Sequence, residues 1–365
     1  MSNSNQQTKA EIVLPSKDLN DDINFFTKKI GMQLDEIFPA DNPSIAVISG
    51  FGLRLRIEKG SDEPVGTIRI LSDNVDQFST TQNYLVAPNG VKIKLVKNTS
   101  ILKMPKTNHD FVVRRLSDQA PWVIGRAGMY YRDLIPSRLG GSIIASHIRI
   151  PDGGPVPDMV HYHTVGFQLI FCYKGWVDLV YEDQGQPFRL NEGCCVIQPP
   201  QIRHRVLFAS NNIEVIEIGV PAEHVTTIDN EMNLPNNTIN RNREFQGQKF
   251  VHHKVKEAVW EPFRLAQFRS RDTSIAKNTK NVAGVKVAKF TGGGDIWSSH
   301  DTDILFNFVM NGHMTLEGEG EKSNDLEPGD AFVIPPHMKT KYSSCTKDLE
   351  LLEVSLPGIF NTAIF

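Results

Sequence analysis

Three histidines at defined spacing carry the clearest chemical signal in the sequence. His161 and His163 are two residues apart in a stretch with strand character. Residues at that spacing project from the same face of a strand, so both imidazoles can reach one ion. His204 follows at the end of the segment GCCVIQPPQIRHRV. Neutral imidazoles suit divalent transition metals, so the pattern predicts a metal site made of His161, His163 and His204.

The residues around these histidines follow the two sequence motifs of the cupin family. The matching positions keep the family spacing within one residue: Gly154, His161, His163, Gln168 and Gly175 in the first motif, then Gly193, Pro199 and His204 in the second. The loop from Gly154 to His161 is one residue longer than the motif, and Gln201 stands where the second motif has glycine. The segment resembles a cupin barrel, which implies a small β-barrel around a metal ion.

Gln168 stands where the cupin motif has a glutamate. A neutral amide leaves more positive charge on the metal than a carboxylate would, and it leaves positions open for substrate and oxygen. Gln168 either ligates the metal or hydrogen-bonds to bound water or substrate. Three-histidine cupins of this kind resemble iron(II) dioxygenases such as the gentisate and salicylate ring-cleaving bicupins. The resemblance implies one divalent ion per chain, with iron(II) first and manganese, nickel or zinc as alternatives.

Several polar residues near the predicted metal ligands could handle a substrate. Arg149 and Gln168 are the candidate catalytic groups, and the substrate-binding candidates are His147, Tyr173, Gln198, Arg126 and Arg132. An arginine inside the barrel would hold a carboxylate or phenolate through two hydrogen bonds. Arg126 and Arg132 have counterparts later in the chain, Arg264 and Arg271, which favours a structural role for this pair.

The chain contains an internal duplication. Landmarks recur after 136 to 138 residues: Trp122 at Trp260, Gly175 at Gly312, Gly193 at Gly329, and Pro199-Pro200 at Pro335-Pro336. Each copy is rich in short strands separated by Gly, Pro and Asn turns, as in small antiparallel barrels. In the second copy the positions of His161, His163, Gln168 and His204 hold Ser298, His300, Leu305 and Thr340. The second barrel has therefore lost the ligand set.

The first hundred residues predict a separate module. Strands are expected at 11–14, 33–37, 44–49, 53–57, 67–71 and 91–96, with a helix before residue 31 and a turn at Pro88-Asn89-Gly90. This βαβββ order resembles the vicinal-oxygen-chelate (glyoxalase-like) fold. That family takes metal ligands from its first and last strands. Glu11 could match one ligand, but Arg56 and Lys94 stand where carboxylates are expected, so the module is predicted to be metal-free.

These patterns predict a mainly β protein with two tandem jelly-roll cupin barrels after a small α+β module. The expected ranges are 1–100 for the module, 110–228 for the first barrel, 229–250 for a linker and 251–365 for the second barrel. Residues 1–10 are small, polar and without period, and we expect them to be disordered.

Composition limits the class of function. The chain has 365 residues and a formal net charge of −3, which argues against a nucleic-acid binder. It shows neither a membrane span nor a signal peptide, and its four cysteines form no CxxC pair. We expect a cytoplasmic protein that acts on a small molecule and forms a homodimer, as cupins commonly do.

The resulting hypothesis is a non-haem iron(II) dioxygenase acting on a small carboxylated or hydroxylated compound. Two alternatives remain open: a non-redox metal-dependent lyase, isomerase or hydrolase, and a binding protein without turnover.

Overall fold

The computed structural model describes residues 9–29, 31–50, 52–62, 67–78, 84–86, 92–97 and 102–365. The chain divides into two compact units. One comprises residues 1–103, 159–164 and 224–232, and the other comprises residues 104–158, 165–223 and 233–365. The predicted turn at Pro88-Asn89-Gly90 and the predicted disorder at residues 1–8 lie outside the described residues. Lys9 and Ala10, which we expected to be disordered, begin the first strand.

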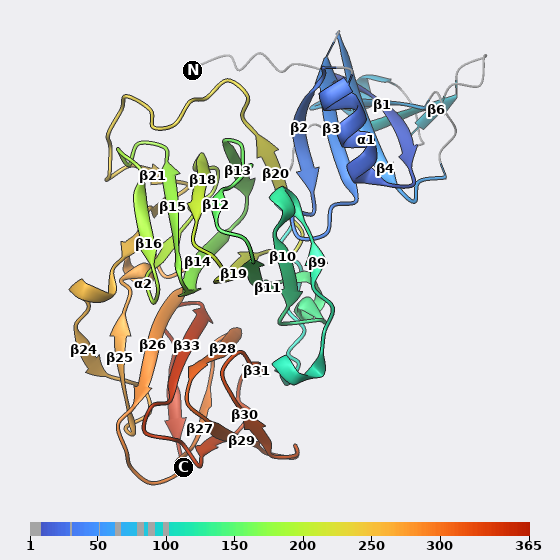
Figure 1. The fold of residues 1–365 in the computed structure, drawn as a ribbon. Helices are drawn as coiled ribbons and strands as arrows, with labels where there is room; N and C mark the ends of the chain where they lie inside the picture. The colour runs from blue at the N-terminus through green and yellow to red at the C-terminus, as the bar shows by residue number, and fades with distance from the viewer. Residues whose placement is uncertain are drawn as a thin grey trace. The chain divides into compact units, whose positions relative to one another are not determined.

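The N-terminal unit has the predicted β-α-β-β-β order, followed by a shorter copy. Its elements (Figure 1) are β1 (Lys9–Ser16), α1 (Leu19–Asn24) continuing into the π-helical turn η1 (Phe25–Lys29), β2 (Gln33–Phe38), β3 (Ile45–Gly50), β4 (Leu53–Lys59), β5 (Thr67–Ser72), the 3-10 turn η2 (Val75–Phe78), β6 (Tyr84–Val86) and β7 (Lys92–Lys97). Within this unit the strand order is β13-β20-β2-β3-β4-β1-β5-β7-β6, where β13 is His161–Thr164 and β20 is Val225–Ile228.

The two halves of this sheet repeat one pattern. β1 runs parallel to β4, β5 runs parallel to β7, and the two halves meet through the antiparallel pair β1–β5. Asp18 accepts hydrogen bonds from the backbone N–H groups of Asn20 and Asp21, so it caps the first turn of α1 as an N-cap aspartate does. The apolar side of the sheet, including Ile48 and Leu55, packs with Leu19 of the helix. The resemblance of this module to the vicinal-oxygen-chelate fold stays a prediction.

Glu11 lies on the opposite side of this sheet and is almost fully buried. Arg54 donates to its Oε1 from Nε at 2.9 Å, and Arg69 donates to its Oε2 from Nη1 at 3.1 Å. Both carboxylate oxygens are therefore used by guanidinium groups that neutralise the charge inside the module. Glu11 acts here as an ion-pair partner.

The first copy of the duplicated region builds a seven-stranded sheet in the order β23-β17-β14-β19-β11-β10-β9. Its strands are β9 (Val123–Ile124), β10 (Tyr130–Asp133), β11 (Ile144–Ile150), β14 (Phe167–Lys174), β17 (Cys195–Ile197), β19 (Ile213–Val220) and β23 (His252–His253). A second group, in the order β16-β15-β18, comprises β15 (Trp176–Tyr181), β16 (Phe188–Asn191) and β18 (His204–Ala209), with β12 (Gly154–Pro155) paired to β18. Side chains from both groups, such as Ile148 and Leu179, share one core.

The second copy repeats the seven-stranded sheet strand for strand. Its seven-stranded sheet runs β24-β25-β26-β33-β28-β31-β8 and contains β24 (Trp260–Pro262), β25 (Phe268–Asp272), β26 (Gly284–Phe290), β28 (Ile304–Asn311), β31 (Ala331–Ile334), β33 (Glu350–Leu356) and β8 (Val112–Arg114). Its five-stranded sheet runs β30-β29-β32-β27-β34 and contains β27 (Trp297–His300), β29 (Met314–Gly318), β30 (Asn324–Leu326), β32 (Thr340–Ser343) and β34 (Thr362–Ile364). The predicted duplication is confirmed by this equivalent strand order.

The remaining short elements connect the strands. They are the 3-10 turns η3 (Leu116–Asp118), η4 (Arg126–Gly128), η5 (Arg138–Gly141) and η6 (Val255–Glu257), the short helix α2 (Ile275–Asn278), and the hairpin β21 (Glu244–Phe245) with β22 (Gln248–Lys249). The hairpin lies in the predicted linker at 229–250. Arg243, just before it, donates to Glu182 at 2.6 Å, which ties this segment to the first barrel. Among the described residues, no helix is long and apolar enough to cross a membrane.

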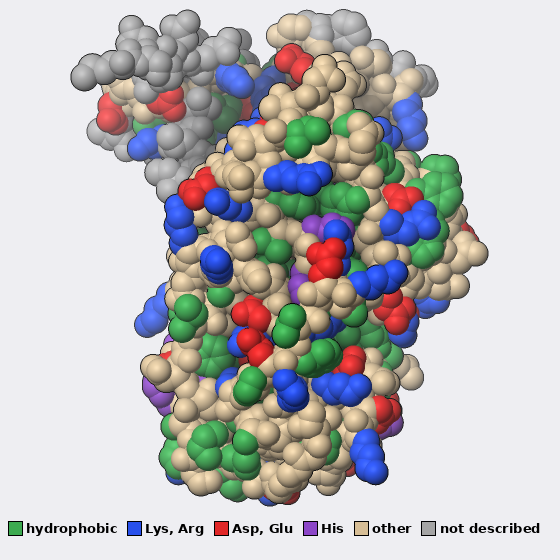
Figure 2. Space-filling model, turned by 90° about the vertical axis from the view of Figure 1, so that its left-hand side faces the viewer, with side chains coloured by type: hydrophobic (Ala, Val, Ile, Leu, Met, Phe, Trp, Pro, Cys, Tyr) green, Lys and Arg blue, Asp and Glu red, His purple; other side chains and the backbone are tan. Residues whose placement is uncertain are grey.

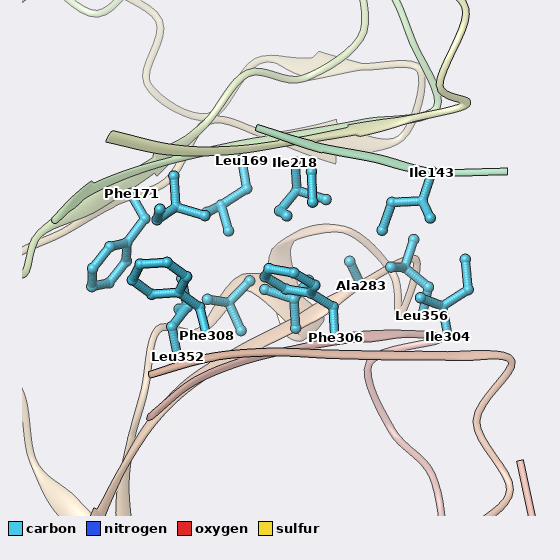
Figure 3. Packing of buried hydrophobic residues seen from close by; sticks show 14 of the residues in the cluster. Ile143, Leu169, Phe171, Ile218, Ala283, Ile304, Phe306, Phe308, Leu352 and Leu356 are labelled. Carbon is cyan, nitrogen blue, oxygen red and sulfur yellow. The ribbon is translucent and has the colours of Figure 1, made fainter. Parts of the chain in front are cut away.

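The two barrels exchange their leading segments. β8, which precedes the first barrel in sequence, pairs with β31 of the second, and β23, which precedes the second, pairs with β17 of the first. Between the seven-stranded sheets lies a hydrophobic core in which Leu169 and Phe171 face Phe306 and Phe308 (Figure 3). Because each barrel completes the other's sheet and shares this core, we expect the two barrels to unfold together.

The surface carries charges of both signs. On the face drawn in Figure 2, basic and acidic side chains are interspersed and form no extended region of one sign. This mixture agrees with the small formal net charge of −3.

Candidate metal centre

The three predicted ligands come together in the folded chain. His161 and His163 project from one face of β13, and His204 begins β18. One ligand atom from each imidazole lies within 4.8 Å of the other two, and all three residues are buried. Imidazole nitrogens bind divalent metals at about 2.0–2.1 Å, so a group of this size can enclose one ion. The three-histidine group is the candidate metal centre.

Backbone carbonyl groups orient two of these rings. Nδ1 of His161 lies 2.7 Å from the carbonyl oxygen of Met159, and Nδ1 of His204 lies 2.9 Å from that of Ile202. A carbonyl oxygen only accepts, so the proton sits on Nδ1 in each ring. The lone pair is then on Nε2, which is the nitrogen that would ligate the metal. Hydrogen bonds of this kind hold metal-binding histidines in the correct tautomer and orientation.

The third ring contacts Thr226 of the neighbouring strand β20 and His224, which lies just before that strand. Nδ1 of His163 lies 2.9 Å from Oγ1 of Thr226, which is opposite His163 in the β13–β20 register and fully buried. His224 lies two residues earlier, and its ring centroid is 5.5 Å from that of His163 in a T-shaped contact. The sequence analysis missed His224, because it stands in the segment PAEH with no partner at motif spacing.

Burial keeps His204 neutral. Loss of solvation lowers the pKa of His204 to about 4, although its hydrogen bond to Ile202 acts in the opposite direction. Its ring stacks on Tyr181, with centroids 5.4 Å apart. A neutral imidazole at pH 7 is the form that binds a metal, so no proton has to be displaced for His204 to act as a ligand.

Gln168 faces the interior of the first barrel, together with a carboxylate that the sequence analysis missed. Gln168 is fully buried, and its Nε2 donates to Oε1 of Glu217 on β19 at 2.5 Å. Glu217 lies an even number of residues from Ile213 and Val215 on β19, so its side chain points to the same face as these two residues of the barrel core. A charged residue at a core position of an apolar strand was the signal that could have identified it.

Gln198 and Arg126 also contribute polar groups to this interior. Nε2 of Gln198 donates to the hydroxyl oxygen of Tyr181 at 2.9 Å. Arg126 donates to Asp158, whose side chain is completely buried. Burial disfavours the charge on Arg126, but Asp158, with smaller contributions from Tyr131 and Glu217, raises its pKa above the usual value. Arg126 is thus a cation already balanced by carboxylates.

Three predicted substrate or catalytic residues lie on the other side of the same sheet. On β11, Ile148 packs inside the barrel, whereas His147 and Arg149 have the opposite parity and line a cavity of about 160 Å³ between the barrels, together with Tyr173. Successive side chains of a strand point to opposite faces, so these residues turn away from the barrel interior. Their predicted roles as groups acting on a substrate at the three histidines gain no support from this placement.

Arg132 also belongs to the contact between the barrels. Its Nη2 donates to Nδ1 of His147 at 3.1 Å and to the carbonyl oxygen of Gly329 in the second barrel at 2.6 Å. His147 in turn donates from Nε2 to Oε2 of Glu214 at 2.7 Å. The structural interpretation of Arg132, suggested by its counterpart Arg271, fits these contacts.

The second barrel has a different interior at the equivalent positions. Ser298, Leu305 and Thr340 replace two histidines and the glutamine, and all three are buried. His300, the remaining histidine, lies 3.1 Å through Nε2 from the carbonyl oxygen of Ile334. Among the described residues, the three-histidine group of the first barrel is the metal-ligand cluster found.

Structural comparison places the chain beside two-barrel proteins. A variant of salicylate 1,2-dioxygenase from Pseudoaminobacter salicylatoxidans superposes with a TM-score of 0.53 and 14% identity, covering 72% of this chain and 90% of that chain. A second variant of that enzyme, in complex with gentisate, has a TM-score of 0.51 and 16% identity over 72% of this chain and 88% of that one. The chain has a bicupin fold.

The sequence comparisons found no match to this chain. No protein-family model matches the chain, and no curated protein matches it in sequence. Oxalate decarboxylase from Bacillus subtilis also superposes, with a TM-score of 0.48 and 11% identity over 73% of this chain and 80% of that chain. At 14% and 16% identity the two salicylate dioxygenase structures show the fold alone, and the chemistry depends on the residues of this chain.

Proposed function

We propose that this protein is a metal-dependent oxygenase in which His161, His163 and His204 hold one iron(II) ion. The proposed substrate is a small organic compound with hydroxyl or carboxyl groups. The observation that carries the proposal is the convergence of three buried imidazoles within 4.8 Å, in which Nδ1 of His161 and of His204 donates to a backbone carbonyl oxygen and leaves Nε2 as the ligating nitrogen. The salicylate dioxygenase fold is compatible with this chemistry but does not establish it.

The donor set fits a ferrous ion. Three neutral histidines leave a divalent ion with its full charge and with coordination positions open to other ligands. An iron(II) ion held there would supply the binding and activation of dioxygen. No carboxylate joins the three histidines as a fourth member of the cluster among the described residues.

The chain's own residues would position the reactants and exclude water. The carbonyl groups of Met159 and Ile202 fix the rings of His161 and His204. Gln168 places a neutral amide inside the barrel, where a fixed dipole can orient a reactant without reorganisation. Burial of the three ligands limits the access of bulk water to the site.

The N-terminal module has a supporting role in this proposal. Its predicted first-strand ligand, Glu11, is engaged by Arg54 and Arg69. We propose that the module, whether or not it derives from the vicinal-oxygen-chelate family, contributes no second metal site.

Metal analysis tests the proposal directly. The full-length protein, purified anaerobically without a tag, is compared with His161→Ala and with the control His300→Gln in the second barrel. We expect about one iron per chain in the wild type and the control, and none in His161→Ala. Oxygen uptake is then measured with a panel of phenols and hydroxylated acids.

Other outcomes would redirect or overturn the proposal. Manganese, nickel or zinc bound to these histidines, without oxygen uptake, would favour a lyase, isomerase or hydrolase. Absence of metal from the wild type even after reconstitution would overturn both enzymatic hypotheses and leave a small-molecule-binding protein.

A further inference from the structure

Gln168 on β14 and Gln198 just after β17 are neighbours in the first barrel, and each has a buried side-chain oxygen. Gln168 and Gln198 are 0% and 5% exposed, and the Oε1 atom of each makes no hydrogen bond within the described residues. The backbone N–H of Gln198 donates to the carbonyl oxygen of Gln168 at 2.9 Å, and the next pair, Leu169 and Ile197, is in register. Directly opposed residues project from the same face of a sheet, about 4.5–5.5 Å apart at Cβ.

That face is the barrel interior. Cys172, four residues after Gln168 on β14, packs in the core of the first barrel, whereas Leu169 and Phe171 pack in the core between the barrels. Period two along the strand therefore directs Gln168, and with it Gln198, into the first barrel.

Glu217 fixes which end of the Gln168 amide is used. An ionised carboxylate accepts hydrogen bonds and cannot donate them, so the contact at 2.5 Å must come from Nε2 of the amide. The amide oxygen is then the atom left to face the interior. If the amide were reversed, two oxygens would be in contact and a buried donor would lose its partner, which is strongly unfavourable.

The second glutamine is connected to the metal centre through Tyr181. Nε2 of Gln198 donates to the Tyr181 hydroxyl at 2.9 Å, and the Tyr181 ring stacks on the ligand His204. The pair of glutamine oxygens thus belongs to the same interior as His204.

The charges around this pair do not favour an anion. Glu217 lies beside Gln168, and the nearby cation Arg126 is engaged by the fully buried Asp158. A carboxylate placed against two amide oxygens and a glutamate would gain no donor from them. Two donor hydrogens, supplied by a pair of hydroxyl groups, an amino group or a water molecule, would satisfy both oxygens.

The second barrel shows that the fold does not need this polar pair. Leu305 stands at the position of Gln168 and is directly opposite Ile334, which stands at the position of Gln198. The counterpart of Glu217, Glu353, is held there by Arg264, with Nη2 and Oε2 2.7 Å apart. The barrel that lacks the histidine cluster is therefore apolar where the first barrel has two amides.

We propose that Glu217 is a positioning residue that presents the Gln168 oxygen to the interior, and that Gln168 and Gln198 form an acceptor pair for a ligand bearing O–H or N–H donors. This inference rests on the proposed function, because it names the group of the substrate that would be recognised next to the metal. That group is a neutral hydroxyl or amino group in preference to a carboxylate.

Ligand binding without turnover tests this proposal. Calorimetric titrations are carried out anaerobically on the metal-loaded full-length protein with three probes: catechol, guaiacol (in which one hydroxyl is methylated) and benzoate. We expect catechol to bind, and guaiacol and benzoate to bind about tenfold more weakly, because each leaves a buried acceptor unpaired. Direct chelation of the metal would also favour catechol, so the variants carry the test.

Gln168→Leu and Gln198→Ile copy the second barrel, and Glu217→Gln allows the Gln168 amide to adopt either orientation. We expect the catechol-to-guaiacol affinity ratio to fall from about tenfold toward one in the two glutamine variants, and to an intermediate value in Glu217→Gln. Gln267→Leu, at a buried glutamine of the second barrel, is the matched control and should keep the wild-type ratio. Metal content and thermal stability are measured in every sample, so that loss of metal or of folding is recognised.

An unchanged ratio in both glutamine variants at full metal content would overturn the proposal, because chelation alone would then explain the preference. So would benzoate binding at least as tightly as catechol, or no detectable catechol binding. If the affinity ratio changes as expected but the protein takes up no oxygen, the acceptor pair would be supported and the proposed oxygenase activity would be rejected. If water bound to the metal is the donor, the metal affinity of Gln168→Leu falls while the ratio of the probes stays constant, which also overturns the substrate assignment.

Discussion

Arg132 and Gly329 join the two barrels: Nη2 of the arginine donates to the carbonyl oxygen of the glycine at 2.6 Å. The duplicated chain makes the same contact in reverse, with Nη2 of Arg271 donating to the carbonyl oxygen of Gly193 at 2.8 Å. Both glycines have positive φ, and a Cβ atom on Gly193 would lie 2.9 Å from Val255 of the other barrel's leading segment. The glycine of the second cupin motif therefore serves the contact between barrels as well as its own turn.

Removal of either arginine should destabilise both barrels. We expect Arg132→Ala and Arg271→Ala each to lower the free energy of unfolding by about 2–4 kcal/mol, because each creates a cavity and leaves a buried carbonyl oxygen without its donor. Urea denaturation followed by fluorescence measures the change. Arg189→Ala, which removes an exposed ion pair to Asp178, is the control and should cost less than about 1 kcal/mol. Equal losses in all three variants would refute the role of the arginine contacts.

Replacing one partner of a buried ion pair in the second barrel should lower the free energy of unfolding more than replacing both partners. Arg264 donates to Glu353 from Nε at 3.0 Å and from Nη2 at 2.7 Å, and Glu353 raises the pKa of Arg264 despite its burial. Glu353→Leu leaves an unpaired buried cation and should cost about 3–5 kcal/mol. Adding Arg264→Met should recover most of that loss. The four proteins of this double-mutant cycle are compared by chemical denaturation, and additive losses would contradict strong coupling.

Thr226 should control the affinity of the metal site. We expect Thr226→Val to weaken metal binding by about 10- to 100-fold, because Nδ1 of His163 loses the hydroxyl that orients the ring. Thr227→Val changes the next residue, which points to the other face of β20 and is half-buried, so it should leave the affinity unchanged. Competition with a chelator of known affinity measures the dissociation constants. A similar affinity in both variants would show that the Thr226 contact is dispensable.

Acidification should reduce the stability of the folded protein, because its buried histidines resist protonation. His300 is such a histidine outside the metal site. Loss of solvation lowers the pKa of His300 to about 4, whereas the unfolded chain has a value of about 6.5. Between these values the unfolded state binds more protons than the folded state, so stability falls as pH decreases through this window. His300 alone should contribute about 2 kcal/mol of loss between pH 7 and pH 5.

His300→Gln tests this contribution, because its amide can still donate to the Ile334 carbonyl oxygen but does not titrate. The free energy of unfolding of the wild type should fall by about 2 kcal/mol more than that of the variant between the two pH values. Identical pH dependence would show that His300 is protonated without cost in the folded protein.

The structure differs from the sequence-based predictions mainly in the face of a strand from which a side chain projects. His147 and Arg149 were grouped with the metal centre because they are close to it in sequence. The register of β11 turns them toward the second barrel and leaves Ile148 inside the first. Successive side chains of a strand point to opposite faces, so a shift of one residue exchanges the inward and the outward side chains. The sequence alone did not show which side chains of β11 face the barrel interior. Glu217 was overlooked for the same reason.

The sequence by itself determined the histidine spacing, the repeat and the loss of ligands in the second copy, because these depend on short-range geometry and on counting along the chain. Period two places His161 and His163 on one face wherever the strand lies. The tertiary structure decided the rest: the exchange of β8 and β23 between barrels, the pairing of Arg132 with Gly329, and the Glu217–Gln168 contact. These contacts join residues 49 to 221 positions apart, and only the packing of whole sheets brings such residues within hydrogen-bonding distance.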